Sequence, residues 1–212
     1  MSELVAGWID PELASEFPEL RVWCLTLDAR SGRSPESLRE RLRDLSDRFR
    51  GPQAVLMRQR PVPWAYRVFF RHIGLDPDVD RTPVEALAVE RLKAGGFRSR
   101  SLLDDALTIA VMETGVPVWA LDAERVAGEL GLRPAARGER SGEGEYASDI
   151  PAGRLLVVDE EGPVGVLFGP LAPGRGVGPG TTAMTLFSVQ VAGVPDIHVE
   201  EALWTVADIV EA

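Results

Sequence analysis

Cysteine, histidine and lysine are nearly missing from this chain of 212 residues, and their scarcity excludes several kinds of site. Cys24 is the only cysteine, so no disulfide forms within the chain. It lies in an alternating, strand-like run, where we expect a buried and unreactive thiol. His72 and His198 are the only histidines, and no Cys or His cluster has ligand spacing, which excludes a structural zinc site. The sequence indicates no metal and no cofactor.

Long apolar runs are also missing. No run approaches the roughly 18 to 20 residues that a membrane-spanning helix requires, so we expect no membrane partner. The segment from Met1 to Asp10 lacks the charged start and long apolar core of a secretory signal, and we therefore expect a cytoplasmic protein. No repeat or linker interrupts the chain, so we predict a single domain over residues 1–212.

Positive charge is in deficit overall but is concentrated in one segment. The net charge is −10, which argues against the uniformly basic surface of a non-specific nucleic-acid binder. Residues 39–100 reverse this balance, with fourteen Arg or Lys against eight Asp or Glu. Two interpretations stay open: the arginines are helix faces paired with nearby acids, or they bind phosphate. In the second, Arg67 and Arg71 are the expected contacts, because residues four apart share a helix face.

Hydrophobic periodicity and turn residues predict helices and strands that are segregated in blocks. The expected helices span residues 34–49, with Ser34 as N-cap, and then 64–73, 82–94, 102–113 and 196–210. The expected strands span residues 20–27, 116–121, 154–159, 164–168 and 183–192. Residues 60–63 are predicted to be extended and residues 138–149 to form an exposed loop. The resulting fold class is α+β, a mixed or antiparallel sheet with flanking helices.

A loop rich in glycine and proline runs from Gly169 to Gly180. It lacks the lysine of a phosphate-binding P-loop, and it leads into a strand where a dinucleotide fingerprint would open a helix. We instead predict a mobile lid with Arg175 at its tip.

Several short motifs follow one another in an order that is informative. The segment 102–113 carries Asp105 and Thr108 and leads to Pro117-Val118-Trp119-Ala120-Leu121-Asp122, which precedes Arg133, the segment 135–139 and the hairpin 157–169. In this order the chain resembles the tRNA-binding B3/4 domain of the phenylalanyl-tRNA synthetase beta subunit, over roughly residues 8–210 and as a free-standing protein. The resemblance implies a B3/4-like domain that recognises the aminoacyl end of tRNA. In the synthetase this domain removes a wrong amino acid from its tRNA.

The chain departs from the family at the proofreading pocket. Trp119 replaces a histidine of the family, and no Asp, Glu or His lies between Gly162 and Pro195 to replace its glutamate. A positioned general base for ester hydrolysis is therefore missing, and no catalytic residue is identified. Threonine hydroxyls can orient water but cannot accept a proton at neutral pH. Hydrolysis would have to use a ribose hydroxyl of the substrate.

Two residues of the predicted site have alternative roles. Trp119 either fills the core beside Pro117 or lines the acyl pocket and stacks on a ligand. Asp122 either forms a bend or binds an amino group. The resemblance implies the substrate-binding set Thr108, Trp119, Asp122, Thr181 and Thr182, and the tRNA contacts Arg67, Arg71 and Arg175.

Three functions stay open at this stage. The first is recognition of the aminoacyl end of tRNA, with or without trans-editing hydrolysis. The second is a non-catalytic module that binds a free amino acid or a related small molecule. The third is a structural role as an assembly surface.

Overall fold

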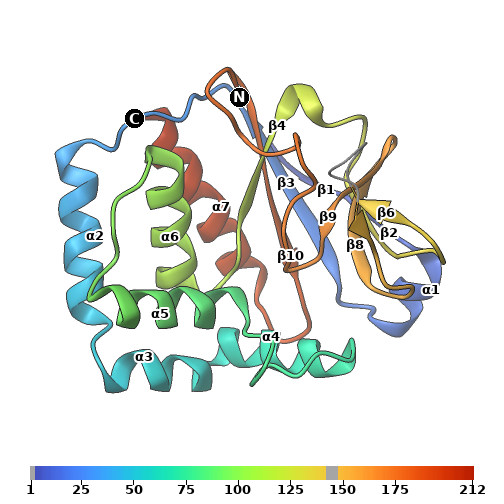
Figure 1. The fold of residues 1–212 in the computed structure, drawn as a ribbon, viewed down its shortest axis with the longest axis horizontal. Helices are drawn as coiled ribbons and strands as arrows, with labels where there is room; N and C mark the ends of the chain where they lie inside the picture. The colour runs from blue at the N-terminus through green and yellow to red at the C-terminus, as the bar shows by residue number, and fades with distance from the viewer. Residues whose placement is uncertain (1–2, 142–147) are drawn as a thin grey trace. The chain divides into compact units, whose positions relative to one another are not determined.

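The computed structural model describes residues 3–141 and 148–212 and confirms the α+β fold class (Figure 1). The chain separates into two compact units, each built from segments that are distant in the sequence. Unit 1 contains residues 1–29 and 120–190, and unit 2 contains residues 30–119 and 191–212. The single domain over residues 1–212 stays a prediction. No helix in the described part of the chain is long and apolar enough to cross a bilayer.

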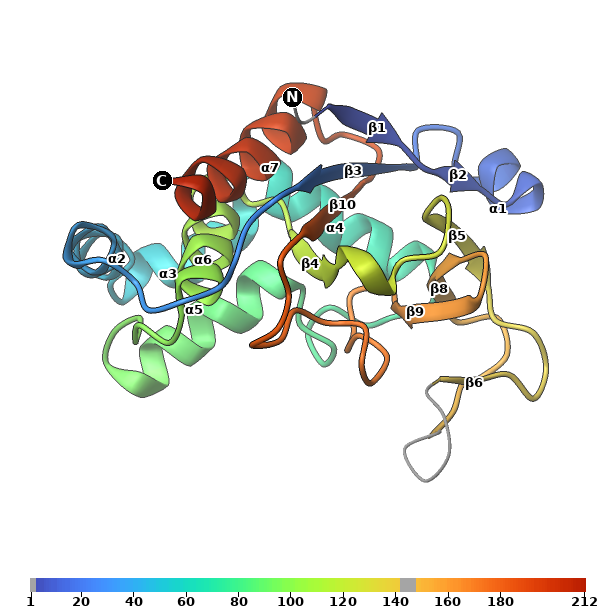
Figure 2. The same ribbon diagram turned by 90° about the horizontal axis from the view of Figure 1, so that it is seen from above.

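The first sheet of unit 1 has the strand order β1-β3-β10-β4. Its strands are β1 (Leu4–Ala6), β3 (Arg21–Leu27), β10 (Met184–Gln190) and β4 (Trp119–Asp122). Strand β3 pairs antiparallel with both β1 and β10, and Figure 2 shows these strands side by side. The alternation of apolar residues predicted β3 and β10, whereas the three residues of β1 are too short to leave a pattern.

The second sheet of unit 1 has the strand order β2-β5-β8-β9. Its strands are β2 (Trp8–Ile9), β5 (Gly131–Pro134), β8 (Leu155–Asp159) and β9 (Gly162–Val166). The hairpin β8-β9 was predicted, but β2 and β5 were not. Gly131 is required where these two strands meet, because an added Cβ would lie 2.1 Å from the indole of Trp8.

Short elements complete unit 1. They are α1 (Pro11–Glu16), the 3₁₀ turn η2 (Ala123–Arg125), β6 (Arg140–Ser141) and β7 (Ser148–Asp149). The predicted loop 138–149 therefore contains a small antiparallel ladder, and its residues 142–147 lie outside the described residues.

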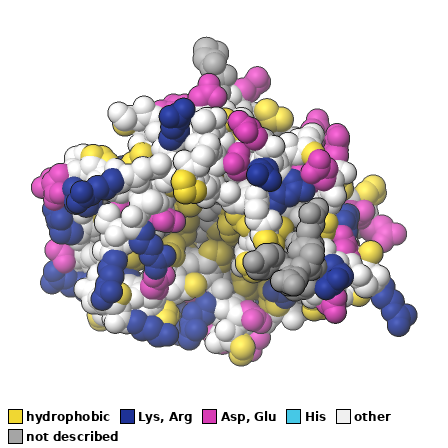
Figure 3. Space-filling model, turned by 45° about the horizontal axis from the view of Figure 1, so that its top comes forward, with side chains coloured by type: hydrophobic (Ala, Val, Ile, Leu, Met, Phe, Trp, Pro, Cys, Tyr) yellow, Lys and Arg dark blue, Asp and Glu magenta, His cyan; other side chains and the backbone are white. Residues whose placement is uncertain are grey.

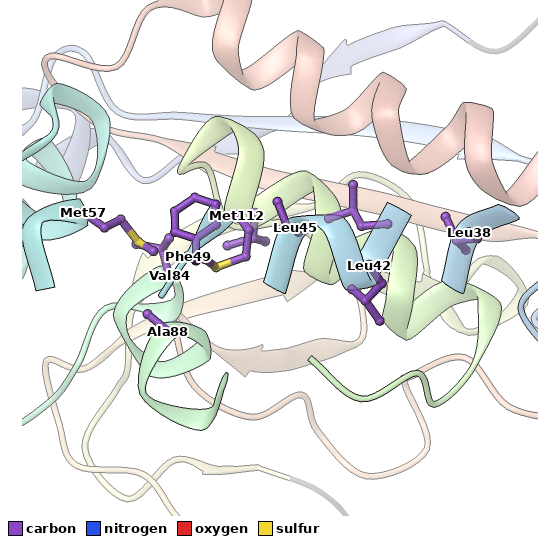
Figure 4. Close-up of a cluster of buried hydrophobic side chains, with 10 residues drawn as sticks. Leu38, Leu42, Leu45, Phe49, Met57, Val84, Ala88 and Met112 are labelled. Carbon is purple, nitrogen blue, oxygen red and sulfur yellow. The ribbon is translucent and has the colours of Figure 1, made fainter. Parts of the chain in front are cut away.

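Unit 2 is helical. Its helices are α2 (Glu36–Arg48), α3 (Pro52–Leu56), the 3₁₀ turn η1 (Met57–Gln59), α4 (Pro61–His72), α5 (Pro83–Ala94), α6 (Leu102–Thr114) and α7 (Asp196–Glu211). Leu38, Leu42 and Leu45 project from one face of α2 into a buried cluster, which Figure 4 shows together with Ala88 and Met112. This burial follows from their helical spacing in the sequence.

Two predicted helix starts are wrong. Ser34 is not an N-cap, because Pro35 occupies the cap of α2 and the Ser34 hydroxyl donates to Asp105 instead, at 2.6 Å. The segment 60–63 is not extended, since α4 already begins at Pro61. Proline is compatible with the first turn of a helix, where the backbone N–H has no partner within the helix.

Local chemistry sets the ends of two helices. Thr82 and Glu85 form a capping box at the start of α5. Gly95 and Gly115 end α5 and α6 in the left-handed conformation, with φ of 75° and 82°. At Gly115 an added Cβ would also lie 2.9 Å from Pro63, so both the positive φ and the lack of space favour glycine there.

Candidate functional site

Asp122, at the end of β4, is fixed by two hydrogen bonds. Its Oδ1 accepts from the backbone N–H of Glu124 at 3.1 Å, and its Oδ2 accepts from the hydroxyl of Thr181 at 2.6 Å. The buried Thr181 hydroxyl accepts in turn from the N–H of Gly178 at 3.0 Å. Asp122 thus forms the bend, and Thr181 joins this bend to the glycine-rich loop. Each Asp122 oxygen can accept one further hydrogen bond, because a carboxylate oxygen has two lone pairs.

Arg175 is held inside unit 1. Its Nη1 lies 2.8 Å from the Oδ2 of Asp159, a side chain with no exposed surface, and the same nitrogen donates to the carbonyl of Arg125. The Arg175 side chain is only 16% exposed. Its carbonyl accepts from the N–H of Asp122 at 3.0 Å, which ties the loop to β4. This geometry differs from the predicted mobile lid, because a buried carboxylate already neutralises the guanidinium.

Asp159 also organises the turn that precedes β9. Its Oδ1 accepts from the N–H groups of Glu161 at 2.9 Å and Gly162 at 3.1 Å, and its Oδ2 accepts from Ala127 at 2.9 Å. A buried carboxylate with this many donors is a structural centre. It accounts for the aspartate in the hairpin motif without a catalytic role.

A cavity of about 920 Å³ lies within unit 1 beside this ion pair. Arg125, Arg140, Glu161 and Arg175 bring both signs of charge to its wall. Arg140 pairs with Asp149 at 3.1 Å, and Arg175 pairs with Asp159. The volume lies within the range of small-molecule sites, but the walls are more polar than those sites usually are.

The predicted substrate-binding residues divide between the two units. Asp122, Thr181 and Thr182 belong to unit 1, and the structure brings Asp122 and Thr181 together. Thr182 follows Thr181 in the sequence and is exposed. Thr108 and Trp119 belong to unit 2, and Trp119 is half-buried at the first position of β4. Their roles at a ligand stay predictions.

Thr108 lies on α6 beside a buried aspartate. Its hydroxyl donates to the carbonyl of Asp104 at 2.8 Å. Asp105 accepts from Ser34 Oγ at 2.6 Å, from Ser99 Oγ at 2.5 Å and from the N–H of Arg100 at 3.0 Å. The cavity next to Thr108 measures about 40 Å³, enough for water rather than an amino acid.

Arg67 has a structural role in unit 2. This buried guanidinium lies 2.6 Å from Asp78 and 2.6 Å from Glu85, and thereby joins α4 to the capping box of α5. Its hydrogen bond to Asp78 holds the pKa of that carboxyl below its usual value. Two carboxylates therefore neutralise Arg67 within unit 2, and a phosphate would have to displace them.

Arg71 differs from Arg67 although it lies one turn further along α4. It is exposed, and its guanidinium carbon lies 5.6 Å from the ring centroid of Trp64. The indole of Trp64 is itself 48% exposed. Of the three predicted tRNA contacts, Arg71 has the geometry of an available cation.

Most other arginines of residues 39–100 are paired with acids. Arg41 and Arg48 both contact Glu113, at 2.6 and 3.2 Å, and Arg100 pairs with Glu90. On the face drawn in Figure 3, basic and acidic side chains are interspersed. Exposed pairs of this kind contribute little to stability but neutralise the surface. The interpretation as paired helix faces therefore fits most of this segment.

The first and last residues of the motif at 133–139 bind each other. Arg133 donates to both carboxylate oxygens of Glu139, at 2.8 and 2.5 Å, and Glu139 also accepts from the N–H of Ala136 at 2.8 Å. The bond from Arg133 holds the pKa of Glu139 below its usual value.

Among residues 3–141 and 148–212, no group of three or more His, Cys, Asp and Glu side chains could hold a metal ion.

Comparison with known proteins gives similarity over part of the chain. No family model matches it. It is 35% identical over 95 residues to the phenylalanine–tRNA ligase beta subunit of Streptomyces avermitilis, covering 44% of this chain and 11% of that one. It is 32% identical over 100 residues to the beta subunit of Leifsonia xyli subsp. xyli, covering 47% and 12%. The matched segment thus spans about a tenth of the length of these curated relatives.

A solved structure is also similar in part. It is an N-terminal fragment of the phenylalanyl-tRNA synthetase beta subunit from Pyrococcus horikoshii, 12% identical, with a TM-score of 0.42. The match covers 51% of this chain and 40% of that one. Similarity to the beta subunit, inferred above from short motifs, is confirmed at the level of sequence over just under half of the chain.

Proposed function

We propose that this protein binds tRNA and recognises its aminoacyl end. The observation that carries the proposal is the 35% identity over 95 residues to the beta subunit of a phenylalanine–tRNA ligase. Identity at this level over a continuous segment is more specific than the short motifs themselves.

Exposed arginine on unit 2 supports the proposal. The exposed guanidinium of Arg71 is not held by a carboxylate in the way that Arg67 is. Arginine binds phosphate through a planar fork of N–H donors, so even one or two exposed guanidinium groups favour RNA over a neutral ligand. We assign an RNA contact to Arg71 and give Arg67 and Arg175 structural roles.

The acyl end of the tRNA would meet Asp122 and Thr182 in unit 1. Thr181 would act through Asp122, whose carboxylate it holds at 2.6 Å. A carboxylate fixed in this way is suited to an amino group, because the amino group would replace the solvent around an oriented acceptor.

Hydrolysis of the aminoacyl ester is the finer form of this proposal. The glycine-rich loop offers no Asp, Glu or His, and Asp122 is already bonded on both oxygens. A substrate hydroxyl would then have to activate the water. We therefore expect binding to be the dominant property and any release of amino acid to be slow.

A binding assay with charged and uncharged tRNA tests the proposal. Purified protein at about 50 mM salt should retain aminoacyl-tRNA on a filter, with an affinity that falls as salt increases. Asp122→Asn should weaken binding of charged tRNA more than of uncharged tRNA, and exposed Arg137→Gln in unit 1 is the matched control. The proposal fails if neither tRNA binds at this salt. A thermal shift with free amino acids but none with tRNA would contradict it equally.

The same mixtures report on hydrolysis. Release of amino acid above the rate without protein would support editing, and Trp119→Ala should abolish selectivity between amino acids. Binding without release would leave tRNA recognition in place and exclude the finer form.

A further inference from the structure

One face of α4 carries an exposed aromatic ring beside arginines. Trp64, Arg67 and Arg71 are spaced by three and four residues and so share this face. Arg67 is turned inward to its carboxylates, whereas Trp64 is 48% exposed and Arg71 lies over its ring. A tryptophan this exposed loses much of the stability that burial of its ring would give. Its exposed ring is therefore available to a ligand.

A groove of about 190 Å³ adjoins this face within unit 2. Arg67 lines it, so the groove and the α4 face share a residue. Its lining also includes Arg58 and Arg81 and the apolar residues Val55 and Leu92, which are 54% and 41% exposed. Val55, Arg67 and Leu92 come from α3, α4 and α5, which Figure 1 shows near one another in unit 2, whereas Arg58 lies in η1 and Arg81 in the loop before α5.

The charges of the groove are not fully balanced. Asp78 and Glu85 are each committed to Arg67 at 2.6 Å. Arg58 reaches Asp78 only at 3.8 Å, and no ion pair is found for Arg81 among the residues that the structure describes. Asp76 and Asp80 lie in the same loop and limit the positive charge. The surface therefore suits a ligand with few phosphates and a flat apolar group, which is an unpaired nucleotide.

We propose that Trp64 and Arg71 stack an unpaired base of RNA, while Arg58 and Arg81 bind the phosphates next to it. Arg71 covers part of the indole, and the exposed remainder of the ring is a surface on which any base can stack. A duplex would bury its bases and present too many phosphates for this surface. The inference rests on the proposed function, since tRNA ends in unpaired nucleotides.

The stacking half of the inference is tested with the full chain and an eight-nucleotide single-stranded RNA ending in CCA. Trp64→Leu should weaken binding about 5- to 150-fold, the usual range for loss of one base–aromatic stack. Trp204→Leu is the matched control, because Trp204 on α7 is 37% exposed and outside the groove. Thermal unfolding confirms that both variants are folded, and Arg71→Gln gives a second, milder change on the same surface.

The phosphate half is tested by the salt dependence of the same binding. Arg58→Gln and Arg81→Gln should each reduce the slope of log K against log salt by about 0.7, as expected for one lost contact to a single strand. Arg43→Gln is the control, because exposed Arg43 pairs with Glu36 and lies on α2. A blunt duplex of equal length should bind more weakly than the single strand.

The outcomes separate the two proposals. If wild-type protein binds tRNA and the variants Trp64→Leu, Arg71→Gln, Arg58→Gln and Arg81→Gln bind it equally well, the inference is overturned and the proposed function stands. If wild-type protein binds neither tRNA nor the single strand, the proposed function fails and the inference falls with it. The stacking site would also be overturned if duplex and single strand bound equally well and Trp64→Leu did not change the affinity for the single strand.

Discussion

The guanidinium of Arg133 lies across the carboxylate of Glu139, with nitrogen–oxygen distances of 2.8 and 2.5 Å. Both residues belong to the motif through which the sequence resembles the synthetase beta subunit. Their bidentate pair, together with the bond from Ala136, closes the chain that follows β5. Part of the resemblance therefore reflects a need of the fold rather than of the ligand.

This pair makes stability depend on pH. The pKa of Glu139 is held below its usual value in the folded protein. The contribution of Glu139 to the free energy of unfolding is therefore complete at pH values above the usual pKa and is lost as the pH falls through the lowered pKa. Glu139→Gln should lower the free energy of unfolding by about 1.5–3 kcal/mol at pH 7, the typical contribution of a hydrogen bond to a charged group. Urea unfolding at pH 7 and pH 3 measures this. An equal loss at both pH values would show that Glu139 acts through packing instead.

Arg67 and Arg71 predict opposite behaviour. Arg67→Met leaves the carboxylate of Glu85, which is 12% exposed, without its cation. It should lower the free energy of unfolding by about 3 kcal/mol. Arg71→Met should change the free energy of unfolding by less than about 0.5 kcal/mol, because the residue is exposed. Denaturant unfolding of both variants checks this, with RNA binding measured alongside. Loss of RNA affinity by a fully stable Arg67→Met protein would contradict the structural role.

These two residues also show where sequence reasoning ends. Four apart on an amphipathic helix, they look equivalent, and only the long-range contacts of Arg67 with Asp78 and Glu85 distinguish them. Ser34 is a similar case, because its true partner Asp105 lies 71 residues away and a cap was the only local interpretation. By contrast, Thr82 with Glu85 and Gly95 with its turn were predictable, since their partners lie within one turn of the helix.

The candidate site was predictable to the same limited extent. The turn preference of aspartate predicted a bend at Asp122 as one of two roles, and the structure shows that bend. The hydrogen bond between Asp122 and Thr181, which is 59 residues away, could not be predicted from local sequence patterns, and neither could the buried pair of Arg175 and Asp159. The Arg175 prediction assumed that a glycine-rich loop is free, whereas long-range hydrogen bonds hold this one.

Cys24 should be unreactive in the folded protein. Burial raises the pKa of its thiol to about 12, so at pH 8 about one molecule in ten thousand carries the thiolate. An aromatic disulfide reagent should therefore label the folded protein far more slowly than the urea-unfolded protein. Cys24 is only partly buried, so equal labelling rates, with the fold checked by circular dichroism, would show that the thiol is already accessible and reactive in the folded protein.

Arg175 and Asp159 test whether the glycine-rich loop is held or free. Arg175→Met leaves a buried carboxylate without its cation, although the N–H groups of Ala127, Glu161 and Gly162 still bind it. We therefore expect a loss of about 2–3 kcal/mol, somewhat less than for a buried pair without such support. Arg137→Met, an exposed arginine in the same unit, should be nearly neutral. Urea unfolding compares the two, and hydrogen exchange at the N–H of Asp122, which donates to the Arg175 carbonyl, should speed up only in Arg175→Met. A neutral Arg175→Met with unchanged exchange would restore the mobile lid, and with it the arginine as a contact for tRNA.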